Sequence, residues 1–315
     1  MRQSISNLRQ LNLIYFMMLT LLGITALATA CTGEDKPTGS HASDQPGSGK
    51  MRVVTTLYPL EYFIGRIGGD SVEVINPVPP GVEAHDFEPR PDDIRKLNSA
   101  DLIVYNGAGF EPWIDRALES IDGSQTLIVE TSRGLADLAS GDPHVWLDPL
   151  KAVEQVKPIL DGMSRANSDS AEVYAQNAGL LVAELEQLHA RFQSALSECR
   201  LSEFITSHDA FGYLARRYGL KQIAIAGLSP EAEPLPRDFA RLADRIEELG
   251  VRYVLVEVIV STRLAEALAK EVGAETLILH PLESLTADES GRGETYFSIM
   301  NANLNSLRAA LECSN

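Results

Sequence analysis

Four of the six histidines lie where a folded chain could gather metal ligands: His85, His144, His208 and His280. Three of them follow a predicted strand, directly or in the loop beyond it, and His144 lies in the loop before a predicted helix. In open α/β sheets, ligands bind at the carboxyl ends of the strands. Four neutral imidazoles suit a borderline cation such as Zn²⁺, whereas hard cations prefer oxygen ligands. The spacings of 59, 64 and 72 residues form no local metal motif. On the residues alone, hydrogen-bonded or surface histidines are therefore an equal alternative.

The octapeptide DPHVWLDP, residues 142–149, surrounds one of these imidazoles with groups that could hold it. His144 lies between a rigid proline and the bulky Trp146, with a carboxylate on either side. A ligand histidine needs its ring held, its second nitrogen occupied by an acceptor, and bulk water excluded. We therefore predict Trp146 and Asp148 as supports of His144. A surface histidine or a helix cap is the alternative.

The elements that must position these residues alternate between strand and helix. Short β-branched or apolar runs predict strands at 51–58, 72–78, 102–105, 126–129, 204–206, 222–226, 251–256 and 276–279. From about Asp169 to Glu198, apolar residues recur at three- and four-residue steps, which predicts one long amphipathic helix. We predict an α/β fold class, with two βα (Rossmann-like) lobes and mostly parallel sheets, and this helix is long enough to join the lobes.

The amino terminus is typical of an export signal. Arg2 and Arg9 precede an uncharged, mostly apolar run that ends at Ala30. Small residues then precede Cys31, and this resembles a bacterial lipobox, in which the cysteine is lipid-modified and becomes the new first residue. An uncleaved membrane anchor is the alternative, since the run is long enough to span a bilayer. The following residues 32–49 are rich in Gly, Ser, Pro and Asp, which predicts a flexible tether.

These features divide the 315 residues into five parts. They are a signal peptide (1–30), a tether after the lipidated cysteine (31–50), an N-terminal metal-binding lobe (51–167), a linking helix (168–198) and a C-terminal metal-binding lobe (199–315). The net charge of −17 argues against nucleic acid as a partner. In an exported protein, Cys199 and Cys313 could form a disulfide, with two separate buried thiols as the alternative.

Six segments, in order along the chain, carry a resemblance to a known family. They are GVEAHDFEP (81–89), YNG (105–107) with Glu111 and Trp113, DPHVWLDP (142–149), SHDAFGY (207–213), LSPEAEP (228–234), and Tyr296 with Met300, Asn303 and Leu304. Together they resemble the metal-binding solute receptors of ABC importers for zinc and manganese, called cluster A-I or cluster 9. The resemblance implies two βα lobes, a long backbone helix and a metal held in the cleft between the lobes.

The resemblance also implies a ligand set. It implies His85, His144 and His208 as ligands, and a histidine at the third position is usual in the zinc receptors. The fourth ligand of the family is usually an Asp in a Leu-Asp-Pro-Leu context, which corresponds here to Leu-His-Pro-Leu at 279–282. We therefore expect His280 to replace that Asp. Glu257 matches a family position and is expected to orient an imidazole, with a surface carboxylate as the alternative.

The expected function is that of an extracytoplasmic zinc receptor that captures Zn²⁺ and delivers it to the membrane permease of an ABC importer. The resemblance implies a monomer in the bacterial cell envelope, with Zn²⁺ as cargo and no enzymatic activity. A manganese receptor of the same family is the first alternative. A zinc hydrolase with three ligands and a water, and an adhesin whose metal site is only structural, are alternatives from other classes. The His-rich loop that many zinc receptors carry before His144 has no counterpart in residues 135–141.

Overall fold

The computed structural model describes residues 49–137, 140–230 and 236–314. The predicted signal peptide, Cys31 and nearly all of the tether lie outside the described residues. The described residues all belong to one compact unit. The predicted boundaries between lobes and linking helix stay predictions, although one four-stranded sheet precedes the long helix in the chain and a second sheet follows it.

The first sheet contains four parallel strands in the order β2-β1-β3-β4. The strands are β1 (Met51–Thr55), β2 (Val72–Ile75), β3 (Leu102–Tyr105) and β4 (Leu127–Glu130). All four residues of β3 are buried, which is the pattern of a central parallel strand covered on both faces. The helices of this half are α2 (Tyr58–Gly68), α3 (Pro91–Asn98), α4 (Ile114–Leu118) and α5 (Pro149–Ala166).

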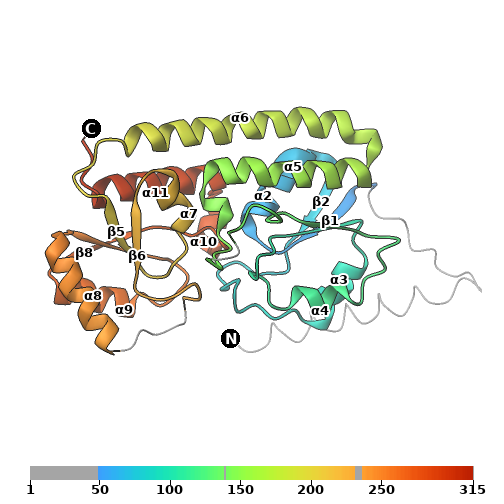
Figure 1. Ribbon diagram of the computed structural model, residues 1–315. Coiled ribbons are helices and arrows are strands. Elements are labelled where there is room, and N and C mark those ends of the chain that lie inside the picture. The colour runs from blue at the N-terminus through green and yellow to red at the C-terminus, as the bar shows by residue number, and fades with distance from the viewer. Residues whose placement is uncertain (1–48, 138–139, 231–235, 315) are drawn as a thin grey trace, which may run out of the picture. The chain divides into compact units, whose positions relative to one another are not determined.

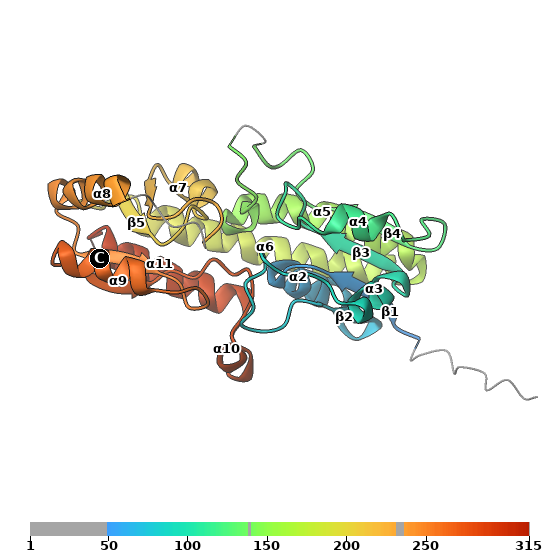
Figure 2. The same ribbon diagram turned by 90° about the horizontal axis from the view of Figure 1, so that it is seen from below.

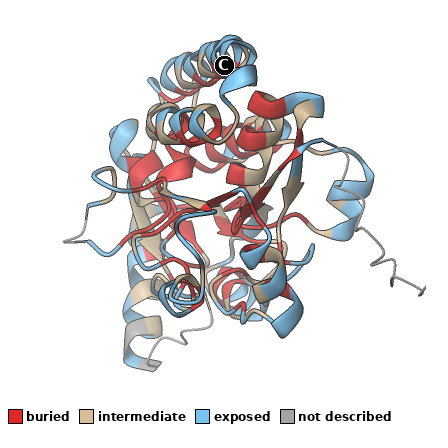
Figure 3. Ribbon diagram, turned by 90° about the vertical axis from the view of Figure 1, so that its right-hand side faces the viewer, coloured by how far each residue is buried: buried red, intermediate tan, exposed pale blue. Residues whose placement is uncertain are grey.

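The second sheet repeats the same order, β6-β5-β7-β8, and all of its strands are parallel. The strands are β5 (Glu203–Thr206), β6 (Lys221–Ala224), β7 (Tyr253–Val256) and β8 (Glu275–Ile278). The helices of this half are α7 (Gly212–Arg217), α8 (Pro236–Leu249), α9 (Arg263–Glu271), α10 (Ala287–Gly291) and α11 (Tyr296–Ala310). The predicted α/β class with two parallel sheets is therefore confirmed, and the buried residues concentrate on the strands and the inward helix faces (Figure 3).

The long helix α6 (Ala171–Ala195) lies against α5 and α11, one from each half (Figures 1 and 2). Its buried face contains the side chains that the apolar spacing predicted, among them Leu181, Leu185, Leu188 and Phe192. The helix is shorter than predicted, because residues 168–170 form a separate 3₁₀ turn and the chain leaves the helix at Leu196. At about 1.5 Å per residue, its 25 residues extend over roughly 37 Å.

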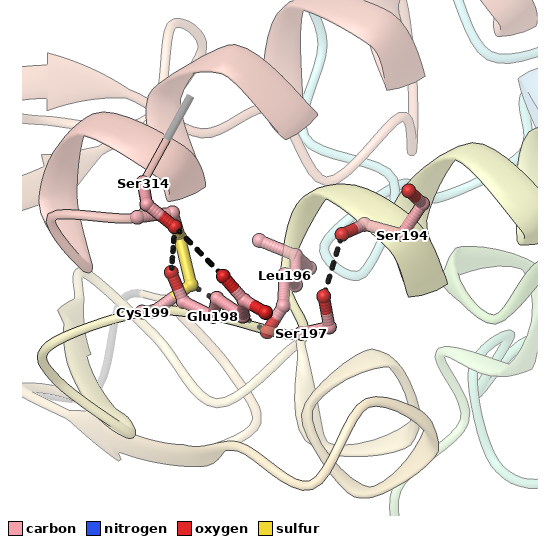
Figure 4. Close-up of a disulfide and its surroundings, with 7 residues drawn as sticks. Ser194, Leu196, Ser197, Glu198, Cys199 and Ser314 are labelled. Carbon is pink, nitrogen blue, oxygen red and sulfur yellow. Dashed lines mark hydrogen bonds between the residues drawn. A yellow bond between two sulfur atoms is a disulfide. The ribbon is translucent and has the colours of Figure 1, made fainter.

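A disulfide joins Cys199, just beyond α6, to Cys313, just beyond α11 (Figure 4). The two cysteines also form an isolated antiparallel bridge. Beside it, the Ser314 backbone N–H donates to the Glu198 carbonyl oxygen at 2.9 Å, and the Ser314 hydroxyl donates to the same oxygen at 3.1 Å. Residues 313 and 314 are thereby fixed to the segment that directly follows the long helix.

The loop after β8, residues 279–286, contacts loops of the first sheet. The Trp146 indole N–H donates to the carbonyl oxygen of Pro281 at 2.7 Å, and the Gly81 N–H donates to that of Leu285 at 2.7 Å. In return, the hydroxyl of Tyr296 at the start of α11 donates to the Trp146 carbonyl oxygen at 2.7 Å. These bonds hold one loop of the second half beside the His144 region.

Candidate metal centre

Three imidazoles and one carboxylate converge in the interior: those of His85, His144, His208 and Glu283. Each offers one donor atom, and the four atoms all lie within 4.8 Å of one another. The Glu283 Oε1 atom lies 3.2 Å from His144 Nε2, 3.4 Å from His208 Nε2 and 3.5 Å from His85 Nε2. His85 Nε2 and His144 Nε2 are themselves 3.2 Å apart.

These spacings fit a tetrahedral zinc ion. Ligand bonds of about 2.0–2.1 Å place neighbouring donor atoms of a tetrahedron about 3.3–3.4 Å apart. Moreover, His208 Nε2 and Glu283 Oε1 are buried atoms with no hydrogen-bond partner among the described residues. Unsatisfied buried polar atoms are costly, so atoms that converge in this way indicate a ligand between them. Nitrogen and carboxylate donors in this number are a usual zinc set.

His144 is held by its own loop. Its Nδ1 atom lies 2.8 Å from Asp142 Oδ1, and the same oxygen accepts the His144 backbone N–H at 3.0 Å. Asn106, directly after β3, donates from its side chain to the carbonyl oxygen of Pro143 at 3.0 Å. The buried Glu111 carboxylate accepts the backbone N–H groups of Asn106 and Gly107 at 2.8 and 2.9 Å, which fixes the turn that carries Asn106. The acceptor behind His144 is thus Asp142, at the other end of the octapeptide from Asp148.

His208 is held by a neighbouring strand. It follows β5 by two residues, and its Nδ1 atom lies 2.6 Å from Oε1 of Glu257, which directly follows β7. Burial lowers the pKa of His208, but the nearby carboxylates of Glu257 and Glu283 outweigh it and raise the pKa to about 10. Glu257 thus lies against the second ring nitrogen of His208, and its orienting role stays a prediction.

Charge balance in the centre comes from Glu283. Burial alone would raise the pKa of this carboxyl group, but its contacts with His144, His208 and His85 hold the pKa well below the ordinary value. The nearby Glu83 accepts the His85 backbone N–H at 3.1 Å. Burial and the charge of Glu283 raise the pKa of Glu83 to about 9. Glu283 is therefore the anion that balances the imidazoles.

The structure does not bring His280 to this group, in contrast to our expectation for the fourth ligand. Its backbone N–H donates to the side-chain oxygen of Asn303 on α11, and its Nδ1 atom accepts the Leu282 N–H, both at 2.8 Å. Its Nε2 atom lies 3.4 Å from the carboxylate of Glu289. Both ring nitrogens are engaged away from the centre, and the chain turns at Leu282, with φ of 65°, before Glu283. The fourth position is taken by Glu283.

The two predicted supports of His144 have different positions. Trp146 packs against His144, with ring centroids 5.2 Å apart, and donates its indole N–H to the loop after β8. Asp148 accepts the Leu150 N–H at the start of α5 and forms an ion pair with Arg217 at 2.7 Å. It therefore caps a helix and does not support the imidazole of His144. The family pattern held the signal for Glu283, because it places a carboxylate in this loop and Glu283 is the carboxylate nearest to His280 in sequence.

Fold and site together define a class: solute-binding proteins with two parallel-sheet halves, a long connecting helix and a buried metal centre supplied by both halves. The family model described as zinc-uptake complex component A, periplasmic (ZnuA), matches residues 53–310, and the chain belongs to this family. The resemblance seen in the sequence is confirmed, and the chain is a binding protein and not an enzyme.

Relatives of similar length and of greater length match most of the chain. The high-affinity zinc uptake system protein ZnuA of Bacillus subtilis is 37% identical over 304 residues, covering 90% of this chain and 94% of the relative. The zinc-binding lipoprotein AdcA of Streptococcus pneumoniae is 34% identical over 285 residues, covering 85% of this chain. The match spans 57% of the length of that relative.

Solved structures agree with this assignment. The Zn(II)-bound ZnuA-like domain of Streptococcus pneumoniae AdcA has a TM-score of 0.76 and 36% identity, covering 84% of this chain and 100% of that chain. The laminin-binding protein Lmb of Streptococcus agalactiae has a TM-score of 0.76 and 33% identity, covering 83% of this chain and 99% of that one. Within the ranges that the structure describes, no helix combines the length and hydropathy needed to cross a bilayer.

Proposed function

We propose that this protein captures Zn²⁺ with His85, His144, His208 and Glu283 and delivers it to the membrane permease of an ABC importer. The observation that supports this most directly is the spacing of the four donor atoms, 3.2–3.5 Å for the contacts measured, which is the spacing of zinc ligands in a tetrahedron. Four protein ligands fill the coordination shell, so the ion is carried and no position is left for catalysis.

Zinc rather than manganese is the proposed cargo. Sites with nitrogen donors generally bind manganese weakest among the divalent first-row metals and zinc far more tightly. Three of the four donors here are imidazole nitrogens. Copper would bind such a site in solution too, so selectivity inside the cell also depends on which metal is available.

The proposed location is the extracytoplasmic face of the cell envelope. The family is described as periplasmic, and a related protein, AdcA of Streptococcus pneumoniae, is described as a lipoprotein. In this chain, small residues before Cys31 support lipid attachment at that cysteine and a tether up to about residue 50. We propose that the protein works as a monomer, because one chain supplies all four ligands.

A second candidate function is adhesion. Lmb of Streptococcus agalactiae is described as a bifunctional protein with adhesin and metal transporting activity. If this chain acts in the same way, purified protein should bind immobilised laminin saturably, and the binding should persist in a Glu283→Ala variant whose fold is intact.

Competition titration of the metal-free protein with Zn²⁺ and Mn²⁺ tests the zinc proposal. We expect one Zn²⁺ per chain, bound at least about 100-fold more tightly than Mn²⁺, in line with the order of affinities at nitrogen sites. Equal affinity for the two ions would favour the manganese receptor. Unchanged zinc uptake in cells that lack the protein would contradict the transport role.

A further inference from the structure

A cavity of about 680 Å³ lies beside the metal centre and has His85 in its wall. The rest of its lining comes from residues 86–89, from Ile94 on α3, and from residues 112–120 around α4. The His85 side chain is 12% exposed, whereas the side chains of His144 and His208 are fully buried and that of Glu283 is 3% exposed. His85 is therefore the ligand that a cargo in this cavity would reach first.

About half of the cavity wall is apolar. Phe87 and Trp113 meet edge to face with ring centroids 5.8 Å apart, and Ile94, Pro112 and Ala117 line the space near them. A hydrated cation gains nothing from such walls, because apolar groups cannot replace its water. Cavities of about 300–1,000 Å³ with apolar and aromatic walls are typical sites for small organic molecules. This apolar part of the wall therefore suits an organic group, and the charged part of the wall is formed by other residues.

Charged groups in the lining could orient that occupant. Arg116, on α4, is exposed, and in the described part of the chain its guanidinium has no hydrogen-bond or ion-pair partner. A guanidinium recognises a carboxylate through strong paired hydrogen bonds. The exposed carboxylates of Asp86 and Glu88 also line the cavity and favour a positively charged metal complex nearby. The cavity thus offers an aromatic wall, the Arg116 guanidinium and a metal ligand.

We propose that this cavity holds the organic part of a zinc chelate, a planar aromatic carboxylate that grips Zn²⁺ through a ring nitrogen and a carboxylate oxygen. This inference rests on the proposed zinc-carrier function. It adds that the protein can receive Zn²⁺ as a complex with an organic chelator. The ring stacks on Trp113, the carboxylate pairs with Arg116, and the zinc faces His85. A lone pair of the His85 imidazole bonds to zinc while a zinc–chelator bond breaks. Zinc stays divalent, and the chelator leaves as its anion.

Binding of pyridine-2-carboxylate (picolinate) to the metal-free protein tests the site at equilibrium. The chain has two tryptophans, of which Trp146 is fully buried and Trp113 lines the cavity. We expect saturable quenching of tryptophan fluorescence that is lost in Trp113→Phe. Because a hydrogen bond to a charged group contributes strongly, Arg116→Gln should weaken picolinate binding at least about tenfold. Arg165→Gln is the matched control, since Arg165 is an exposed arginine on α5 that pairs with Asp161.

Stopped-flow transfer from the 1:1 zinc–picolinate complex tests delivery. We expect Arg116→Gln to slow this transfer at least about threefold and to leave uptake of hydrated Zn²⁺ unchanged, because the guanidinium contacts the chelator and not the metal. Pyridine-3-carboxylate has the same ring and charge but cannot chelate, so it should occupy the cavity, compete with zinc–picolinate and deliver no zinc.

The outcomes separate this inference from the zinc-carrier proposal. Absence of saturable quenching, or equal picolinate affinity and transfer rate in the wild type and Arg116→Gln, would overturn the chelate site while zinc binding stands. A wild-type protein that binds no hydrated Zn²⁺ would overturn the carrier function, whatever picolinate does. Weaker picolinate binding in Arg116→Gln but not in Arg165→Gln supports the site.

Discussion

The two halves of the molecule share one strand order but deliver their metal ligands differently. In the first half, both histidines come from loops beyond the edge strands β2 and β4. In the second half, His208 follows the central strand β5, and Glu283 follows the edge strand β8. Sheets of equal topology therefore need not present ligands at equivalent points, because loop length decides which side chain reaches the centre.

The support behind each imidazole differs too. Nδ1 of His208 contacts Glu257, which is 49 residues away in sequence but lies next to it because β5 pairs with β7. Nδ1 of His144 contacts Asp142, two residues away in the same loop. For His85, no hydrogen bond to Nδ1 is found in the described part of the chain. The second half thus holds its histidine through the sheet, whereas the first half holds His144 within its own loop and, among the described residues, gives the more exposed His85 no hydrogen bond at Nδ1.

The sharpest way to break this comparison is to remove the one ligand that is not a histidine. Glu283→Gln removes a buried charge that faces three imidazoles. Loss of a buried charged partner costs about 3–5 kcal/mol, so we expect zinc affinity to fall by roughly two to three and a half orders of magnitude. Titration against a zinc chelator measures it. His280→Ala is the control and should keep its zinc affinity. If His280→Ala loses zinc binding and Glu283→Gln keeps it, His280 is the fourth ligand.

The disulfide should stabilise the second half of the molecule against unfolding. Cys199 and Cys313 close a loop with a sequence separation of 114 within the second half. Removal of a disulfide from a loop of this length destabilises a protein by at most about 4–5 kcal/mol in the chain-entropy model. We expect Cys199→Ser with Cys313→Ser to lower the urea midpoint accordingly. Wild-type protein treated with a reductant is the control, and an unchanged midpoint in both would show that the bond adds no stability.

Substitution of the two orienting carboxylates compares the halves directly. Glu257→Gln and Asp142→Asn keep the size of each side chain but remove the charge behind His208 and His144. Removal of such partners typically lowers metal affinity about 10–100-fold. We expect the larger loss for Glu257→Gln, because its 2.6 Å contact is the shorter of the two. Zinc titration of both variants measures the difference, and Asp148→Asn should leave the affinity unchanged.

The pH dependence of zinc affinity tests the role of His208. Its pKa is raised to about 10, so the metal-free protein holds a proton there at neutral pH, and zinc must displace it. We expect zinc affinity to rise by up to about tenfold per pH unit between pH 5 and 8. Calorimetry in buffers of different ionisation enthalpy would count the protons released, and a count of zero would contradict this assignment.

The same shift sets the stability of the metal-free protein. A raised pKa in the folded state stabilises the fold fully below the ordinary value of 6.5, and this stability is lost as pH rises through about 10. We expect the melting temperature of metal-free protein to fall between pH 7 and 10, and that of the zinc-bound protein to change less.

Much of this site could be predicted from the sequence, because three ligands are imidazoles in segments that resemble those of a known family. His85 and His208 lie beyond predicted strands, and His144 lies before a predicted helix. His85, His144 and His208 come together as expected, and Glu257 lies behind His208. Glu283 escaped prediction because His280, not Glu283, aligns with the family's Asp, and the turn at Leu282 that brings Glu283 inward could not be seen in the sequence. Likewise, the sequence offers an acid on each side of His144, and only the helix start at Pro149 assigns Asp148 to capping.

The turn at Leu282 limits how this chain can vary. Leu282 is fully buried and has a positive φ, a region that costs an ordinary residue about 1–2 kcal/mol. A β-branched side chain would fit this backbone worse, and glycine would relax it but leave a hole in the core. Few replacements satisfy both demands, so a single leucine that never touches the ion restricts the substitutions available to the loop that carries Glu283.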